Sequence, residues 1–126
     1  MWKLALEYIH KCYGLAEGLP LREERNLKSQ IRRAATSVAL NIAEGSTGQT
    51  DSEQARFLGL ALRSLIETVA CERIVVRRGY AVDGELLRDV RTQGELLAKR
   101  PQAMRKAIAP RGHATRDDRA GYDLLE

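Results

Sequence analysis

The chain has 126 residues, enough for one domain with a single core, and a net charge of +4 at neutral pH. Only 5% of its residues are aromatic, so the core must be built from Leu, Ile, Val and Ala, which suits packed helices and disfavours a β-sandwich. No apolar run approaches the ~20 residues needed to cross a bilayer, and the mixed first ten residues do not fit a signal peptide, so we expect a cytoplasmic protein with no membrane partner.

The first predicted helix covers residues 2–17, where apolar residues recur at helical spacing. Gly18 ends it, and Leu19-Pro20 makes the turn. Cys12 lies in this apolar pattern and Cys71 in a later one, without C-x-x-C spacing, which predicts free buried thiols. We interpret Tyr8 and Tyr13 as residues at the rim of the core rather than as platforms for base stacking.

The second predicted helix, residues 21–44, has three facets. Its apolar stripe is Leu27, Ile31, Ala34, Ala35, Val38 and Ile42, and its basic stripe is Arg25, Lys28 and Arg32. The third facet is a polar seam of Gln30, Arg33, Ser37, Asn41 and Glu44. Two interpretations of the seam stay open: a solvated flank, or a side that meets protein and pairs its polar groups across helices.

The loop GSTGQT, residues 45–50, lacks the Gly-Lys-Ser/Thr ending and the preceding strand of a phosphate-binding loop. Gly45 fits the residue that follows the second helix. Thr50 and Glu53 predict a capping box that opens a third helix over residues 51–78.

The third helix has an apolar arc too wide for one neighbouring groove. The arc comprises Phe57, Leu58, Ala61, Leu62, Leu65, Val69, Val75 and Val76. We interpret its second side as the contact with another copy of the chain. Arg63 and Glu67, together with Arg56, form a polar edge that is the expected counterpart of the seam.

A fourth helix, capped by Asp83, should complete an all-α, up-down-up-down antiparallel four-helix bundle over residues 1–109. Gly94 and Pro101 lie in its apolar seam, and because proline removes a backbone donor, we expect a kink or break near Arg100. Residues 110–126 lack sustained periodicity and are predicted to be a disordered polar tail.

Basic residues are concentrated late in the chain. Residues 99–126 carry 7 basic and 4 acidic side chains, and no acid occurs between 99 and 116. Such a segment favours polyanions, although a solvated helix end has the same composition. The candidate nucleic-acid-binding residues are therefore Lys99, Arg100, Arg105 and Lys106, together with Arg25, Lys28 and Arg32.

No catalytic constellation is evident. His10 and His113 are far apart in sequence and lack spaced thiols or carboxylates that would complete a metal set. Ser37 and Ser64 have no evident histidine base. We expect no enzyme activity, no metal and no cofactor.

The run QIRRAATSVALNIAEG at residues 30–45, with Leu19-Pro20 and Glu24 before it and FLGLALRSLIE at residues 57–67, carries a family resemblance. It resembles the small four-helix-bundle family of bacterial large-subunit rRNA intervening-sequence proteins, which also takes in Avd-type accessory proteins of diversity-generating retroelements. The resemblance implies a pentameric ring of bundles with basic surfaces. In the retroelement branch the partner would be a reverse transcriptase with its template RNA.

The sequence therefore predicts a non-enzymatic, homo-oligomeric protein that binds RNA or DNA through phosphate contacts, with strong salt dependence and weak sequence preference. The alternative is a protein-interaction scaffold whose basic surface docks an acidic protein. The residues do not choose between the rRNA and retroelement branches.

Overall fold

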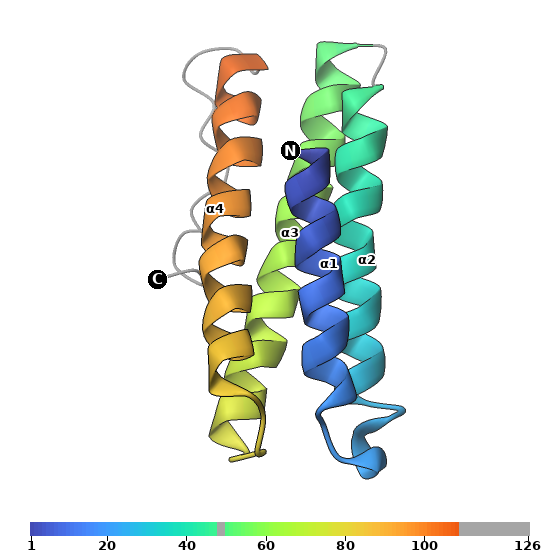
Figure 1. Cartoon of the computed structure of the whole chain (residues 1–126). Helices are drawn as coiled ribbons and strands as arrows, with labels where there is room; N and C mark the ends of the chain where they lie inside the picture. The colour runs from blue at the N-terminus through green and yellow to red at the C-terminus, as the bar shows by residue number, and fades with distance from the viewer. Residues whose placement is uncertain (48–49, 109–126) are drawn as a thin grey trace.

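The computed structural model describes the backbone of residues 1–47 and 50–108, and the side chains as far as Lys99. The described chain is all-α and confirms the predicted fold class. It contains α1 (Trp2–Glu17), α2 (Leu27–Ser46), α3 (Asp51–Arg77) and α4 (Gly84–Ile108), with a short 3₁₀ turn, η1 (Leu21–Glu23), before α2. The helices alternate in direction and pack side by side (Figure 1). The predicted polar tail lies outside the described residues.

The core is built from small and aliphatic residues, as the composition requires. All six residues of the apolar stripe on α2 are buried, from Leu27 to Ile42. Tyr8 is completely buried, so its predicted place at the core rim is wrong. Gly94 of α4 gives the ring its space: a Cβ atom there would lie 3.3 Å from Cε1 of Tyr8, a tight contact. Tyr13 does lie at the surface, 36% exposed.

The second helix starts later than predicted. Residues 21–23 form η1 and residues 24–26 form a turn, so Arg25 precedes α2 instead of lying on it. The backbone of Asn26 leaves the helical region, with φ −125° and ψ −102°. A tertiary contact explains the change, because Glu23 accepts hydrogen bonds from the Tyr80 hydroxyl and from the Asn26 side chain.

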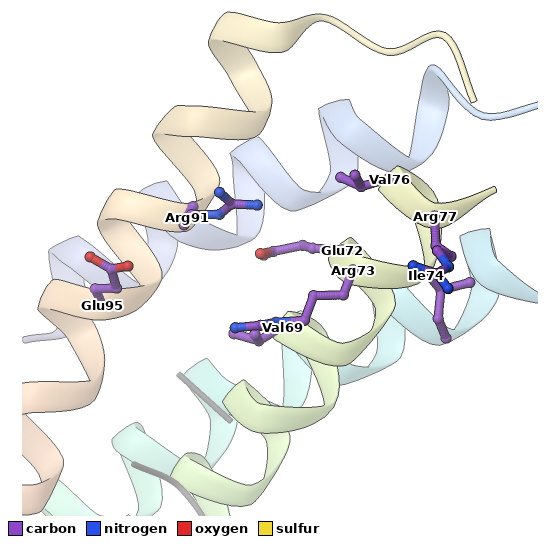
Figure 2. Close-up of a pocket in the computed structure, with 8 residues that line it drawn as sticks. All are labelled: Val69, Glu72, Arg73, Ile74, Val76, Arg77, Arg91 and Glu95. Atoms are coloured by element: carbon purple, nitrogen blue, oxygen red, sulfur yellow. The ribbon is translucent and has the colours of Figure 1, made fainter. Parts of the chain in front are cut away.

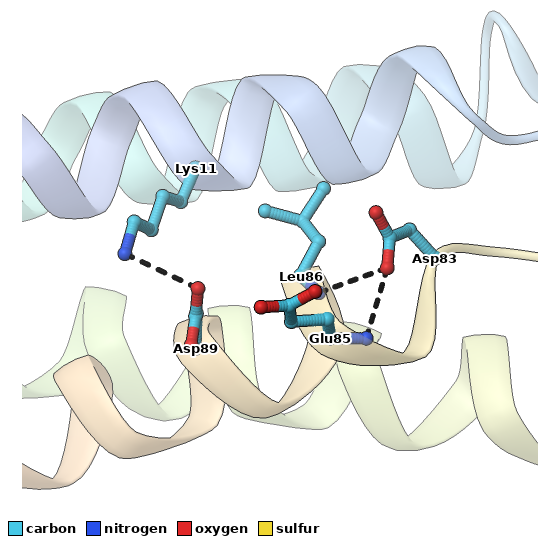
Figure 3. Close-up of polar contacts among 5 residues, drawn as sticks. All are labelled: Lys11, Asp83, Glu85, Leu86 and Asp89. Atoms are coloured by element: carbon cyan, nitrogen blue, oxygen red, sulfur yellow. Dashed lines mark hydrogen bonds and ion pairs between the residues drawn. The ribbon is translucent and has the colours of Figure 1, made fainter.

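The starts of α3 and α4 are formed by the predicted residues, Thr50 and Asp83. The Thr50 hydroxyl accepts a hydrogen bond from the Glu53 backbone at 3.1 Å. Gly79, at φ +71°, ends α3, and the Tyr80 amide donates back to the Val75 carbonyl, the pairing of a Schellman motif. Asp83 accepts from the amides of Glu85 at 2.9 Å and Leu86 at 3.3 Å, which caps α4 (Figure 3).

Two predicted interruptions are absent. Gly45 lies inside α2 and is buried, and a Cβ there would lie 3.4 Å from Cβ of Phe57, so this glycine serves close packing of α2 on α3. Of the kink or break expected near Arg100, the break is absent, since α4 continues to Ile108 through Pro101. Loss of one backbone hydrogen bond there does not end the helix.

The wide apolar arc of α3 is largely satisfied inside the chain. This helix packs against both α2 and α4, so it needs two buried sides. Leu58, Ala61, Leu62, Leu65 and Val75 are all buried. Val76 remains 50% exposed, as does Ile74 at 46%. The arc by itself therefore does not require a second copy.

Candidate nucleic-acid interface

The basic residues predicted on the second helix lie at one end of the bundle and share an acidic partner. Lys28 is 8% exposed, and its Nζ lies 3.4 Å from Glu24 Oε2. Arg32 donates to Glu24 Oε1 at 3.2 Å. Arg32 and then Lys28 lower the pKa of Glu24, which keeps this carboxylate charged and reduces the positive field. Arg25 is exposed in the turn before α2.

Tyr80 joins further arginines to this end. The Arg22 guanidinium lies 5.4 Å from the centroid of the Tyr80 ring, and that of Arg78 lies 5.9 Å from it. The Tyr80 hydroxyl donates to Glu23, and this bond, followed by that from Asn26, lowers the Glu23 pKa. A guanidinium stacked on a ring keeps donors in its own plane for other partners. We call Arg22, Arg25, Arg32 and Arg78 the turn-end arginines.

The sequence analysis missed Arg22, which lies in η1 after α1, and Arg78, which caps the end of α3. They are far apart in sequence, and only the fold brings both to the Tyr80 ring. The predicted cluster on α4 lies elsewhere. Lys99 is exposed, while the side chains of Arg100, Arg105 and Lys106 lie outside the described residues. The carboxyl end of α4 and the turn-end arginines lie at opposite ends of the bundle, so the structure does not bring the two predicted groups together (Figure 1).

A cleft of about 750 Å³ is lined by side chains of α3 and α4 (Figure 2). Its walls combine apolar, basic and acidic side chains, namely Val69, Glu72, Arg73, Ile74, Val76 and Arg77 of α3 with Arg91 and Glu95 of α4. The sequence analysis missed this basic wall, although the spacing of Arg73 and Arg77, one helical turn apart, was a signal that could have found it.

Glu72 is the chemically unusual group of this cleft. Its side chain is 2% exposed and accepts a hydrogen bond from the Tyr8 hydroxyl at 3.3 Å. Burial raises the pKa of the Glu72 carboxyl to about 7, although the Tyr8 bond and the nearby Arg91 and Arg73 oppose the rise. Burial likewise raises the pKa of Tyr8 and of the free thiol of Cys12.

The polar seam is neither fully solvated nor fully buried. At its centre, Ser64 of α3 donates to Ser37 at 2.8 Å, and the Asn41 amide donates to the Ser37 carbonyl at 2.9 Å and hydroxyl at 3.1 Å. Gln30 donates to Asn26 at 2.8 Å. The remaining members, Arg33 and Glu44 on α2 with Arg63 and Glu67 on α3, are exposed. Ser64, which was not among the predicted seam residues, therefore makes a hydrogen bond between α2 and α3.

Ser37 and Asn41 also line a second, shallower groove of about 490 Å³ between α1 and α2. Tyr13, Arg32, Arg33, Thr36 and Leu40 complete its walls, and Leu40 is 59% exposed. Because α1–α2 and α3–α4 are opposite pairs in the bundle, this groove and the cleft lie on opposite faces.

The described residues also bear on metal binding and on membrane spanning. No group of three or more His, Cys, Asp or Glu residues within 1–47 and 50–108 is arranged to hold a metal ion. None of the helices in these ranges combines the length and the apolarity that a membrane span requires.

The fold and these surfaces define a small four-helix bundle that gathers several arginines around Tyr80 at one end. The chain belongs to the 23S rRNA-intervening sequence protein family, whose family model matches residues 1–99. This match confirms the resemblance carried by NIAEG and by residues 57–67. A search among curated proteins found no match.

Proposed function

We propose that the protein is a non-enzymatic, homo-oligomeric accessory protein that binds structured RNA through phosphate contacts. The observation that carries the proposal is the gathering of Arg22 and Arg78 on the Tyr80 ring, beside Arg25 and Arg32. The family description, which refers to 23S rRNA, supports a large-subunit rRNA partner. An Avd-like role with a reverse transcriptase and its RNA is the second form of the same proposal.

Contacts with the phosphate backbone of the RNA fit this surface better than recognition of base edges does. Arginine donates two parallel hydrogen bonds to a phosphate, and the Tyr80 ring restrains two of these side chains before binding, so less side-chain entropy is lost. No helix of the described bundle stands clear of its neighbours to enter a groove. Lys28 contributes through its charge, since it is buried, while Lys99, Arg100, Arg105 and Lys106 form a second contact at the far end.

Self-association would multiply these modest contacts. Large apolar side chains remain exposed outside the cleft, including Trp2 at 45%, Leu6 at 45% and Leu40 at 59%. Exposed apolar groups of this kind mark protein contacts when they are contiguous. The subunit number of five comes from the resemblance alone.

The test is a salt titration of affinity for a structured RNA. We expect Arg22→Gln/Arg78→Gln to weaken binding and to reduce the slope of log K against log salt by about 1.5, because each lost phosphate contact removes roughly 0.7–0.9. The same measurement on Lys99→Gln/Arg100→Gln should give a similar loss. Arg56→Gln/Arg63→Gln is the control. It removes two charges from exposed positions elsewhere, so it should leave the number of phosphate contacts, and therefore the slope, unchanged.

An unchanged slope in both test variants would remove these residues from the interface. If the wild type binds no RNA at ~50 mM salt, the proposal fails and the scaffold with an acidic protein partner remains.

A further inference from the structure

The cleft between α3 and α4 presents apolar surface that the described bundle leaves uncovered. Ile74 and Val76 are 46% and 50% exposed, and Val69 beside them is only partly buried. Figure 2 shows Val76 of α3 directed toward Arg91 of α4, while Ile74 lies on another side of α3, beside Arg77. Half-exposed aliphatic side chains around a concave site favour an occupant that brings apolar groups of its own.

The charges of the cleft define the occupant further. Arg73, Arg77 and Arg91 line the walls, against Glu95 and the buried Glu72. An occupant that combines acidic with apolar side chains would satisfy both features. A second copy that presented its α1–α2 groove would bring Arg32 and Arg33 towards these arginines, which repels. Nucleic acid would match the arginines but would leave Ile74 and Val76 without apolar partners.

We propose that residues 117–126 of the same chain occupy this cleft. This segment, DDRAGYDLLE, carries four acidic residues and one basic residue, Arg119, and its apolar residues are Tyr122, Leu124 and Leu125. The preceding residues 99–116 carry six basic residues and no acid, so they would be repelled by the cleft. Acidic groups of 117–126 pair with Arg77 and Arg91, while Leu124 covers Val76 between them.

The chain is long enough to reach the site. Residues 108 to 122 span up to about 46 Å when extended, at roughly 3.3 Å per residue. From Ile108 back to Arg91, α4 measures about 26 Å, at 1.5 Å per residue. The connecting segment can therefore cover this distance at a little over half of its full extension, about 26 of about 46 Å. Tethering also gives the segment an effective concentration in the range of mM, so that weak individual contacts suffice.

The test is disulfide trapping in the full chain. In Val76→Cys/Leu124→Cys we expect mild oxidation at low micromolar protein to produce an intramolecular disulfide in most molecules. Leu40→Cys/Leu124→Cys is the matched control: Leu40 is similarly exposed and apolar but lies on the opposite face, so it should trap at most a tenth as fast. Val76 and Leu40 are both half-exposed, and native Cys12 and Cys71 are buried, so neither folding nor background thiols should interfere.

Charge reversal gives the second arm. Adding Arg77→Glu/Arg91→Glu to Val76→Cys/Leu124→Cys should slow trapping about tenfold, and adding Asp117→Arg/Asp123→Arg to that variant should restore it. Equal trapping rates in the Val76→Cys pair and the Leu40→Cys pair would overturn the proposal. Disulfide-linked dimers in place of the intramolecular product would also overturn it and would assign the cleft to a second copy. None of these readouts involves RNA, so the outcome is independent of the proposed function.

Discussion

At Glu72 the folded chain holds a carboxyl group out of water between two helices. Its hydrogen-bond donor on α1 is the Tyr8 hydroxyl, and Tyr8 in turn packs on Gly94 of α4. A single buried contact set therefore links α1, α3 and α4. A substitution at Glu72 should affect stability through proton binding, and a substitution at Gly94 should affect it through packing.

Glu72→Gln should change how stability depends on pH. Because the folded pKa of about 7 lies above the ordinary value of 4.5, the unfolded chain releases its proton first as pH rises. The contribution of Glu72 to wild-type stability should therefore be present at low pH and be lost between about pH 4.5 and 7, by an amount on the order of 3 kcal/mol. Glutamine stays neutral and still accepts from Tyr8, so the variant should match the wild type near pH 5 and exceed it at pH 8.

Urea unfolding at pH 5 and pH 8 measures this difference. Glu67→Gln, which neutralises an exposed carboxylate on the same helix, is the control and should remain within roughly 0.5 kcal/mol of the wild type at both values. If Glu72→Gln retains the wild-type dependence on pH, the buried carboxyl is not its source.

Gly94→Ala should destabilise the bundle although alanine is the better helix former. The gain in helix propensity is about 1 kcal/mol, but the new methyl group would lie 3.3 Å from a Tyr8 ring that is fully buried and bonded to Glu72. Overpacking at such a site costs about 1–3 kcal/mol, so we expect a net loss near 1 kcal/mol in thermal or urea unfolding. Gly84→Ala, with nothing within 4 Å of the new atom, should be neutral or stabilising.

At the scale of the elements, the sequence predicts those helix boundaries that depend on interactions between neighbouring residues. The boundaries of α1 follow from its periodicity and Gly18, and the starts of α3 and α4 follow from Thr50 and Asp83, whose caps involve neighbouring amides. The start of α2 was mispredicted because Glu23 bonds to Tyr80, a residue 57 positions away. Gly45 was misread for a similar reason, since its role is to admit Phe57 of the next helix.

The candidate site shows the same division. Basic residues can be counted in the sequence, but their environment depends on the fold. Lys28 adjoins the apolar stripe and becomes buried, while Arg22 and Arg78 converge on one ring from separate turns. The burial of Glu72 was not predicted, because the sequence does not show which residues of the other helices surround a single acidic residue.

At the scale of the whole molecule, self-association can be tested through Asn41. Within one chain, both hydrogen bonds of its amide go to Ser37 on the same helix, so Asn41→Ala should cost a monomer less than about 0.5 kcal/mol. If the seam meets another copy, the variant should leave a polar partner unpaired, at about 1–3 kcal/mol. We expect sedimentation at micromolar concentration to show a smaller oligomeric fraction.

Ser46→Ala is the matched control, since Ser46 also bonds one turn back on α2, to Ile42, but lies outside the seam. It should not change the distribution of species. A wild type that sediments as a stable monomer at micromolar concentration would rule out the oligomer.

The pairing of α1 with α4 has a consequence for how the chain folds. Lys11 meets Asp89 at 3.5 Å (Figure 3), and the Tyr8 ring packs on Gly94, so the helix at the start of the chain is matched to one almost eighty residues later. α2 and α3 are joined by a short connection and share the most extensive contact. Loop closure over the longer separation costs more entropy, so we expect the α2–α3 hairpin to organise the folding transition state and α1 to dock on α4 afterwards. Gly94→Ala should then speed unfolding while leaving the folding rate nearly unchanged.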